Sequence, residues 1–323
     1  MMSAMVFRAI LGLIALSGCS AQTAPAKTVA PTDAGWSIES VGDLNLLFDC
    51  LADKNIALVA AHRGGPRPGY PENAIETFER TLSETPAFIE ADVATSSDGV
   101  LYLMHDDTLD RTTTGDGPTD ASAWADIATL QLEDWRGEAT AFHPPTFAGA
   151  LEWAKGRTIL EIDFKKTTKY EDVIAEIDRQ NAADRVILIA YSLAQARRLH
   201  RLAPATMISL SLASQSDLNR AVAGGVPADR LLGFTGVESP DPRLFSVLNN
   251  ADVEVIFGTL GGQASLDDKA KAGGDALYAE LASDGVDIIA TDRPLAAHRA
   301  LVAAKRGATA GQCGITNQRQ EQS

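Results

Sequence analysis

Short runs of β-branched and apolar residues alternate along most of the chain with longer segments in which apolar positions recur at helical spacing. Eight of the short runs are typical of buried strands: Ala57–Ala61, Phe88–Val93, Thr158–Phe164, Arg185–Ile189, Thr206–Leu210, Arg230–Gly233, Val253–Phe257 and Val286–Ala290. Each run is followed by a helix-like segment, and no long linker separates the units. The pattern therefore predicts an α/β fold, a closed (β/α)8 TIM barrel rather than an open doubly wound sheet.

One region interrupts this alternation. Residues 100–146 begin with the strand-like sequence VLYLMH and continue with a polar stretch rich in Asp, Thr, Gly and Pro. A loop between a strand and a helix usually has ~2–6 residues, so this stretch is interpreted as an insertion after strand 2. Because barrel enzymes carry their active sites at the carboxyl ends of the strands, the insertion is expected to cover the mouth of a pocket.

The amino terminus is typical of an export signal. Arg8 precedes the apolar run Ala9–Leu16, which is shorter than the ~20 residues of a membrane-spanning helix. Leu16-Ser17-Gly18-Cys19 resembles the bacterial lipobox, in which the cysteine becomes the lipid-modified first residue of the mature protein. We therefore expect lipidation at Cys19 and a membrane-anchored lipoprotein that faces the periplasm.

These features predict four regions. A signal peptide (1–18) is followed by a lipid-anchored tether (19–40) whose small, polar, Pro-containing sequence suits a flexible linker. The barrel is expected over residues 41–306, and residues 307–323 are expected to form a flexible tail.

Two further cysteines, Cys50 and Cys313, would lie in an oxidising compartment. Cys50 precedes the first predicted strand and Cys313 follows the last predicted helix, and a closed barrel brings its first and last units together. The two can therefore pair. Because Cys313 lies in the expected tail, the sequence leaves a disulfide and two free thiols as alternatives.

Composition and charge narrow the function. A hydrophobic content of 45% supports one large core, and 28 Lys and Arg residues against 43 Asp and Glu residues give a formal net charge of −15. This charge repels nucleic acid, so no nucleic-acid partner is expected. A small anionic substrate requires a metal or a few well-placed cations to reverse the field locally.

Carboxylates on two predicted strands indicate such a metal. Glu90 and Asp92 point to the same side of the second strand, ~6–7 Å apart. In a buried site this pair requires a compensating cation, and its oxygen ligands suit Ca²⁺ or Mg²⁺. The third strand places Glu161 and Asp163 on one face, with Lys165 further toward the mouth. This strand supplies a third carboxylate and an ammonium group where a phosphate can dock.

Two histidines are candidates for acid and base chemistry. The first strand ends in His62 and Arg63, which places an imidazole and a guanidinium at the rim of the barrel. His105 lies in the insertion, next to the same predicted site. Imidazole is the side chain best suited to general acid and base catalysis near neutral pH.

These residues belong to a longer series of motifs: His62-Arg63-Gly64, Pro71-Glu72-Asn73, Glu90-x-Asp92, Ser97-Asp98-Gly99, His105-Asp106, Leu109-x-Arg111-Thr112-Thr113-x-Gly115, Glu161 and Thr291-Asp292-Arg293-Pro294. In this order and approximate spacing, the series resembles the glycerophosphodiester phosphodiesterase family. The resemblance runs from Val59 to Pro294, nearly the whole expected domain.

The resemblance implies a barrel enzyme that hydrolyses glycerophosphodiesters to glycerol 3-phosphate and an alcohol. It implies that one divalent metal, Ca²⁺ or Mg²⁺, is held by three carboxylates, those of Glu90, Asp92 and Glu161. His62 and His105 would form the acid/base pair, in an order that the sequence does not assign, and Arg63 would bind the phosphate. In this family the glycerol hydroxyl of the substrate is thought to attack phosphorus, giving a cyclic phosphate that water then opens.

One position departs from the family pattern. The family usually has Glu-x-Lys on this strand, whereas here Asp163 stands two residues after Glu161 and Lys165 follows two further on. Phosphate binding then depends on Lys165 reaching back, which a long flexible side chain can do. We expect Lys165→Ala to raise KM more than it lowers the chemical rate. In the alternative, Asp163 joins or tunes the metal shell.

Two other functions remain open at this stage. The same groups could act on a lysophospholipid or a related phospholipid headgroup, in the manner of a phospholipase D, and a large exposed apolar groove would favour that substrate. A non-catalytic barrel that binds a ligand is the second alternative. Loss of a motif residue would favour it, and both histidines and all three expected carboxylates are present.

Overall fold

The computed structural model describes residues 35–40 and 42–321 and confirms the predicted (β/α)8 barrel. Eight parallel strands form the barrel: β2 (Leu58–Ala61), β3 (Phe88–Thr95), β5 (Leu160–Phe164), β6 (Val186–Ala190), β7 (Met207–Ser211), β8 (Leu231–Phe234), β9 (Glu254–Gly258) and β10 (Ile288–Thr291). Pairing of β2 with both β10 and β3 closes the sheet. Each of the eight predicted strands overlaps one of these.

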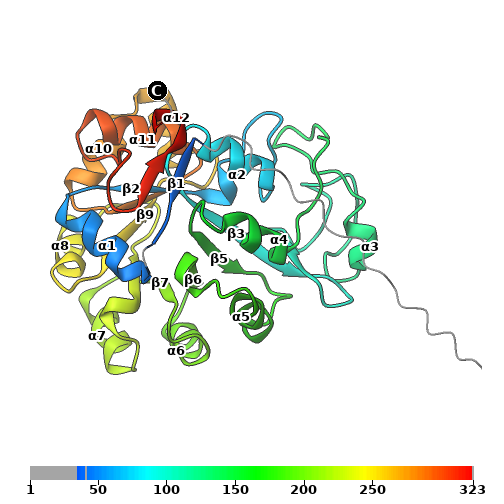
Figure 1. Cartoon of the computed structure of the whole chain (residues 1–323), viewed down its shortest axis with the longest axis horizontal. Helices are drawn as coiled ribbons and strands as arrows, with labels where there is room; N and C mark the ends of the chain where they lie inside the picture. The colour runs from blue at the N-terminus through cyan, green and yellow to red at the C-terminus, as the bar shows by residue number, and fades with distance from the viewer. Residues whose placement is uncertain (1–34, 41, 322–323) are drawn as a thin grey trace, which may run out of the picture. The chain divides into compact units, whose positions relative to one another are not determined.

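Helices surround the strands in Figure 1. They are α1 (Leu44–Asp53), α2 (Ile75–Leu82), α3 (Trp124–Ile127), α4 (Phe147–Ala154), α5 (Tyr170–Arg179), α6 (Leu193–Leu202), α7 (Gln215–Ala223), α8 (Pro242–Asn249), α9 (Leu266–Gly273), α10 (Ala276–Ser283), α11 (Pro294–Ala303) and α12 (Gln318–Glu321). Three short 3₁₀ turns also occur: η1 (His62–Gly64), η2 (Ala183–Arg185) and η3 (Ala228–Arg230). Among the described residues, no helix is both long enough and apolar enough to cross a membrane.

Alternation along the strands divides the core into two layers. Val59 and Ala61 of β2 pack in the layer between strands and outer helices, whereas Leu58 and Ala60 pack in a second cluster with helix α1. Phe88, at the start of β3, belongs to this second, interior cluster. Since side chains two residues apart share a face, the positions that follow Phe88 on the interior face are those of Glu90 and Asp92.

The insertion after the second barrel strand begins with β4 (Leu101–Leu103), which pairs antiparallel with β3. Its small apolar cluster includes Tyr102 and Ile127. The backbone N–H of Met104 donates to the carbonyl oxygen of Asp92 at 3.0 Å. The insertion is therefore fastened to the carboxyl-terminal half of β3, directly before His105.

The two ends of the domain differ from expectation. Residues 36–38, expected in the tether, form β1 (Trp36–Ile38), which pairs antiparallel with β11 (Ile315–Asn317) of the expected tail. The two strands lie side by side in Figure 1. Ile38 and Ile315 are buried. The prediction of a flexible tail was therefore wrong for the part that the structure describes. The sequence did not indicate this, because pairing with a remote segment leaves no mark on local composition.

A disulfide links Cys50 of α1 to Cys313, with their Cα atoms 5.7 Å apart. It joins the first helix to the segment just before β11. Of the two alternatives that the sequence left open, the structure has the disulfide. Residues 1–34, with the signal peptide and Cys19, lie outside the described residues.

Candidate active site

Four buried carboxylates from two neighbouring strands form the floor of the candidate site. Strands β3 and β5 are in register, so Glu90 lies beside Glu161 and Asp92 beside Asp163. All four side chains are buried. This arrangement follows from the alternation of the two strands, which places two acidic residues of each strand on the interior face.

Three of the four carboxylates are close enough to share one metal ion. Ligand oxygens of Glu90, Asp92 and Asp163 all lie within 4.8 Å of one another. The expected set was Glu90, Asp92 and Glu161; Asp163 stands beside Asp92 on the neighbouring strand, and Glu161 stands beside Glu90. Glu161 still lines the same cavity.

The electrostatics of the floor fit a bound cation. Burial, reinforced by the charges of Asp92 and Asp163, raises the pKa of Glu90 well above its usual range. Burial likewise raises the pKa of Glu161 to about 7. Burial opposes ionisation of Asp92 as well, but the Lys165 ammonium and the Arg63 guanidinium outweigh it and lower its pKa. So much buried negative charge is stable when a cation compensates it.

His62 lies where strand β2 ends, within the turn η1, and is held by Asp292 at the end of β10. The two side chains meet at 2.6 Å through Nδ1 of the histidine. Burial opposes ionisation of Asp292, but the hydrogen bond from His62 prevails and lowers the pKa of Asp292. The carboxylate therefore accepts from Nδ1–H, which directs the chemistry of the ring to Nε2.

His105 has the same kind of partner. Its Nδ1 lies 2.6 Å from Oδ1 of the adjacent Asp106. Arg111 donates to both oxygens of Asp106 and thereby lowers the pKa of this carboxyl group. Both predicted histidines thus have Nδ1 engaged by a carboxylate, which leaves Nε2 as the other ring nitrogen.

A chain of ion pairs connects the two histidine-bearing segments. Glu72 accepts from Arg63 at 2.9 Å and from both terminal nitrogens of Arg111 at 2.8 Å. Arg63, the expected phosphate ligand, has a φ of 48° and also donates from its backbone N–H to Glu90. Its side chain therefore lies at the edge of the acidic floor, with Nε 3.6 Å from Asp92.

Lys165 is the second expected phosphate ligand, and its side chain extends back to the carboxylates of β3 and β5. Its Nζ lies 3.1 Å from Oδ1 of Asp92 and 3.1 Å from Oδ2 of Asp163. Burial opposes its charge, but the two carboxylates raise the pKa of Lys165. The ammonium group is thus a charged part of the acidic floor.

These groups open into a cavity of about 160 Å³. Both histidines and all four carboxylates line it. The rest of the lining is largely apolar and consists of Ile189, Tyr191, Ser209, Ser211, Phe234, Ile256, Leu260 and Ala290. Of the residues named from the sequence, the two histidines and the three expected metal ligands therefore line one cavity.

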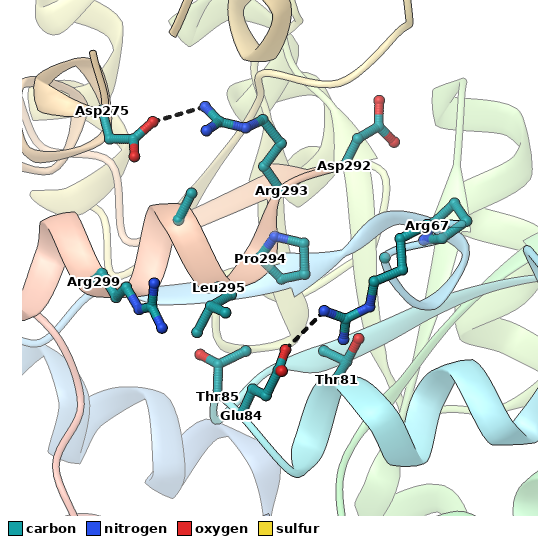
Figure 2. Close-up of a pocket in the computed structure, with 13 residues that line it drawn as sticks. Arg67, Thr81, Glu84, Thr85, Asp275, Asp292, Arg293, Pro294, Leu295 and Arg299 are labelled. Atoms are coloured by element: carbon teal, nitrogen blue, oxygen red, sulfur yellow. Dashed lines mark hydrogen bonds and ion pairs between the residues drawn. The ribbon is translucent and has the colours of Figure 1, made fainter. Parts of the chain in front are cut away.

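The motif Thr291-Asp292-Arg293-Pro294 holds the closing strand of the barrel in place. Arg293 pairs with Asp275 at 2.7 Å, away from Asp292, as Figure 2 shows in a neighbouring cavity of about 330 Å³. Gly65 has a φ of 79°, and a Cβ there would lie 2.7 Å from Cγ of Pro294. The glycine after the His62-Arg63-Gly64 motif is therefore required for close packing of η1 against the start of α11.

Sequence reasoning missed three supporting residues. Asp292 orients His62, Asp106 orients His105, and Asn73 binds Asp92. Each occurs in a motif that the sequence displays, but no role could be assigned before the partners were seen together. An acidic residue directly after a predicted strand, as at Asp292, was the available signal.

The fold and the site define a (β/α)8-barrel protein with a buried acidic centre and two carboxylate-oriented histidines. Residues 62–253, more than half of the chain, match the Glycerophosphoryl diester phosphodiesterase family. The chain therefore belongs to this family.

Individual relatives agree with this assignment. The chain is 32% identical over 160 residues to a glycerophosphodiester phosphodiesterase of Caldanaerobacter subterraneus, an overlap of 47% of this chain and 65% of that relative. Its structure resembles a glycerophosphoryl diester phosphodiesterase of Parabacteroides distasonis, with a TM-score of 0.78, 29% identity and coverage of 88% of this chain and 99% of that one. It also shares its fold with an Oleispira antarctica phosphodiesterase solved with the product sn-glycerol-3-phosphate, at 21% identity, a TM-score of 0.61 and coverage of 78% and 99%.

Proposed function

We propose that the protein hydrolyses glycerophosphodiesters to glycerol 3-phosphate and an alcohol, with one divalent metal and the acid/base pair His62 and His105. The observation that carries the proposal is a single cavity lined by the acidic cluster and by two histidines, each oriented through Nδ1 by an aspartate. The product bound to the Oleispira phosphodiesterase supports the same substrate class.

The buried carboxylates fit a divalent cation. Glu90, Asp92 and Asp163 would hold it, with the expected ligand Glu161 beside Glu90 on the neighbouring strand, and their oxygens suit Ca²⁺ or Mg²⁺. Bound there, the metal would neutralise charge on the phosphodiester and polarise it. The buried oxygen Oδ1 of Asp163 has no hydrogen-bond partner among the described residues, as expected of an oxygen reserved for a ligand.

The histidines supply the proton transfers. As the attacking hydroxyl oxygen bonds to phosphorus, one imidazole, neutral at that stage, accepts the hydroxyl proton at Nε2. As the bond between phosphorus and the departing alcohol breaks, the other imidazole, protonated, donates its proton to the leaving oxygen. Asp292 and Asp106 stabilise the protonated form of each ring and hold its orientation.

The size of the cavity favours deacylated substrates. A volume of about 160 Å³ suits a phosphate and a glycerol moiety. The apolar wall with Phe234 and Leu260 is the feature that would favour a lysophospholipid as second candidate, if its chain extended along that wall.

A substrate panel tests the proposal. Chelator-stripped protein receives glycerophosphocholine, glycerophosphoethanolamine or lysophosphatidylcholine, with Ca²⁺ or Mg²⁺ added back, and release of glycerol 3-phosphate or of choline is followed. We expect turnover of the two deacylated substrates, dependent on metal and lost in His62→Ala and Glu90→Gln. Exposed Glu280→Gln serves as the control. Metal-independent turnover, or none in the wild type, would contradict the proposal.

We also propose that the mature protein is a lipoprotein anchored through Cys19 and facing the periplasm. The lipobox-like Leu16-Ser17-Gly18-Cys19 supports the anchor, and the Cys50–Cys313 disulfide fits an oxidising compartment. Mass spectrometry of the purified amino terminus should find a diacylglyceryl group on Cys19. In a Cys19→Ser variant the protein should leave the membrane fraction, and retention there without modification would refute the anchor.

A further inference from the structure

Lys165 occupies a special place among the charged groups of the site. Its ammonium lies 3.1 Å from each of two carboxylates that also belong to the metal-binding cluster, those of Asp92 and Asp163. The side chain of Lys165 is 16% exposed, against 2% for Asp92 and 10% for Asp163. The ammonium is therefore a largely buried cation at the edge of the cluster, on the side of the solvent.

The backbone fixes this placement. Lys165 follows the last residue of β5, and its backbone N–H donates to the carbonyl oxygen of Val93 on β3 at 3.0 Å. This hydrogen bond anchors the base of the side chain between the two strands that carry the carboxylates. The flexible four-carbon chain then allows the ammonium to swing while the backbone stays in place.

A divalent ion and this ammonium compete for the same two carboxylates. Ca²⁺ binds oxygens at about 2.3–2.6 Å, so an ion shared by Glu90, Asp92 and Asp163 would lie within a few ångströms of the present position of Nζ. Two cations at that separation in a buried site repel each other strongly. The carboxylates of Asp92 and Asp163 therefore bind either the ammonium or the metal at full strength, but not both at once.

We propose that Lys165 is an internal counter-ion that fills the cluster in the metal-free protein and is displaced when the metal binds. The displaced ammonium then lies at the mouth, where it meets the phosphate of the substrate. Metal binding is thus expected to precede productive substrate binding. This inference rests on the proposed metal-dependent function and adds an exchange of cations at the same site.

Asp163 completes the exchange. It adds a carboxylate to the floor beside Asp92. Its Oδ2 holds Lys165, while its buried Oδ1 has no hydrogen-bond partner in the described part of the chain. Asp163 thus holds the ammonium in the metal-free protein and has a second oxygen to offer when the metal replaces the ammonium.

The test measures metal binding without substrate. Chelator-stripped wild type, Lys165→Met and Lys166→Met are titrated with Ca²⁺ and with Mg²⁺ in a calorimeter, and the melting temperature of each metal-free protein is recorded. Lys166→Met is the matched control, because it removes the same charge from the next residue, whose side chain is 83% exposed. We expect Lys165→Met to bind metal at least about 10-fold more tightly and to melt at a lower temperature when metal-free, with Lys166→Met close to wild type.

The outcomes separate the two proposals. If wild type binds no metal, the proposed function fails. If wild type binds metal but Lys165→Met binds it equally or less tightly, the inference alone is wrong, and Lys165 is a fixed structural partner.

A second measurement needs only folded wild type. The NMR signals of ¹³C-methylated lysines are followed during metal titration, and the Lys165 signal is assigned by its loss in Lys165→Arg. Displacement predicts a shift of this signal that saturates with one equivalent of metal, whereas an unmoved signal would overturn the inference.

Discussion

Asn73 binds Asp92 through both ends of its amide group. Its Nδ2 donates to Oδ2 of Asp92 at 2.8 Å, and its Oδ1 accepts from the backbone N–H of Asp92 at 3.0 Å. Asn73 is buried and has a φ of 57°, a left-handed conformation that asparagine adopts more readily than most residues. The Asp92 carboxylate is therefore oriented before any cation arrives.

Asn73→Ala should weaken metal binding by about 10- to 100-fold, because partners that orient a ligand contribute roughly that much to affinity. It should also lower the free energy of unfolding by about 1–3 kcal/mol, since a buried carboxylate loses a donor. Calorimetric metal titration and urea denaturation measure the two effects. The control is Asn250→Ala, which removes an exposed amide that donates to Ser246. Metal affinity equal to that of the control would show that Asp92 is oriented without Asn73.

Asp292 orients His62 as Asn73 orients Asp92. Its replacement should lower the catalytic rate. Asp292→Asn removes the charge that stabilises a protonated His62, so we expect kcat to fall by about 10²- to 10⁴-fold. Metal affinity should stay near that of wild type, because Asp292 is no member of the acidic cluster. Steady-state kinetics and metal titration separate the two, and Asp275→Asn, at the exposed partner of Arg293, is the control. A loss confined to metal affinity would assign Asp292 a different role.

The local patterns of the sequence were sufficient for the barrel and for most of the candidate site. The eight strands were predictable because both of their faces are buried, which leaves runs such as Val186–Ala190 almost without polar residues. Alternation alone placed Glu90 and Asp92 in the interior. His105 was identified because the insertion that carries it interrupts the alternation of strands and helices.

What the sequence could not supply is the geometry between segments. The grouping of Asp163 with Glu90 and Asp92 depends on how β3 pairs with β5, which no local pattern encodes. The partnership of His62 with Asp292 spans the closure of the barrel. The pairing of β1 with β11 joins segments whose compositions are typical of linkers.

Glu254 makes the stability of the fold depend on pH. Its Oε2 is buried without a hydrogen-bond partner among the described residues, and burial, with the nearby charge of Asp287, raises the pKa of Glu254 to about 8. An unfolded glutamate has a pKa of about 4.3. Between these values the unfolded chain binds fewer protons than the folded one, so this residue lowers stability as the pH rises.

Glu254→Gln should therefore be more stable than wild type at pH 8, by on the order of 4 kcal/mol. The difference should shrink to less than about 1 kcal/mol near pH 4, where the carboxyl group is protonated in the folded state and mostly protonated in the unfolded state. Urea denaturation at pH 4.5, 6 and 8 measures the trend, and Glu280→Gln at an exposed position of α10 is the control. A stability difference that does not change with pH would mean that Glu254 is ionised in the folded protein.

The Cys50–Cys313 disulfide should contribute strongly to stability, because it spans 263 residues of sequence and fastens the segment that carries β11 to helix α1. A cross-link that closes a long loop restricts the unfolded chain, and removal of such a bond costs about 2–5 kcal/mol. For a domain of this size that corresponds to a fall in melting temperature of about 10 °C. Differential scanning calorimetry with and without reductant measures it. The double variant Cys50→Ser/Cys313→Ser should melt like reduced wild type and no longer respond to reductant. Equal melting temperatures of oxidised and reduced wild type would mean that β1, β11 and the buried Ile38 and Ile315 hold the end of the chain without the covalent bond.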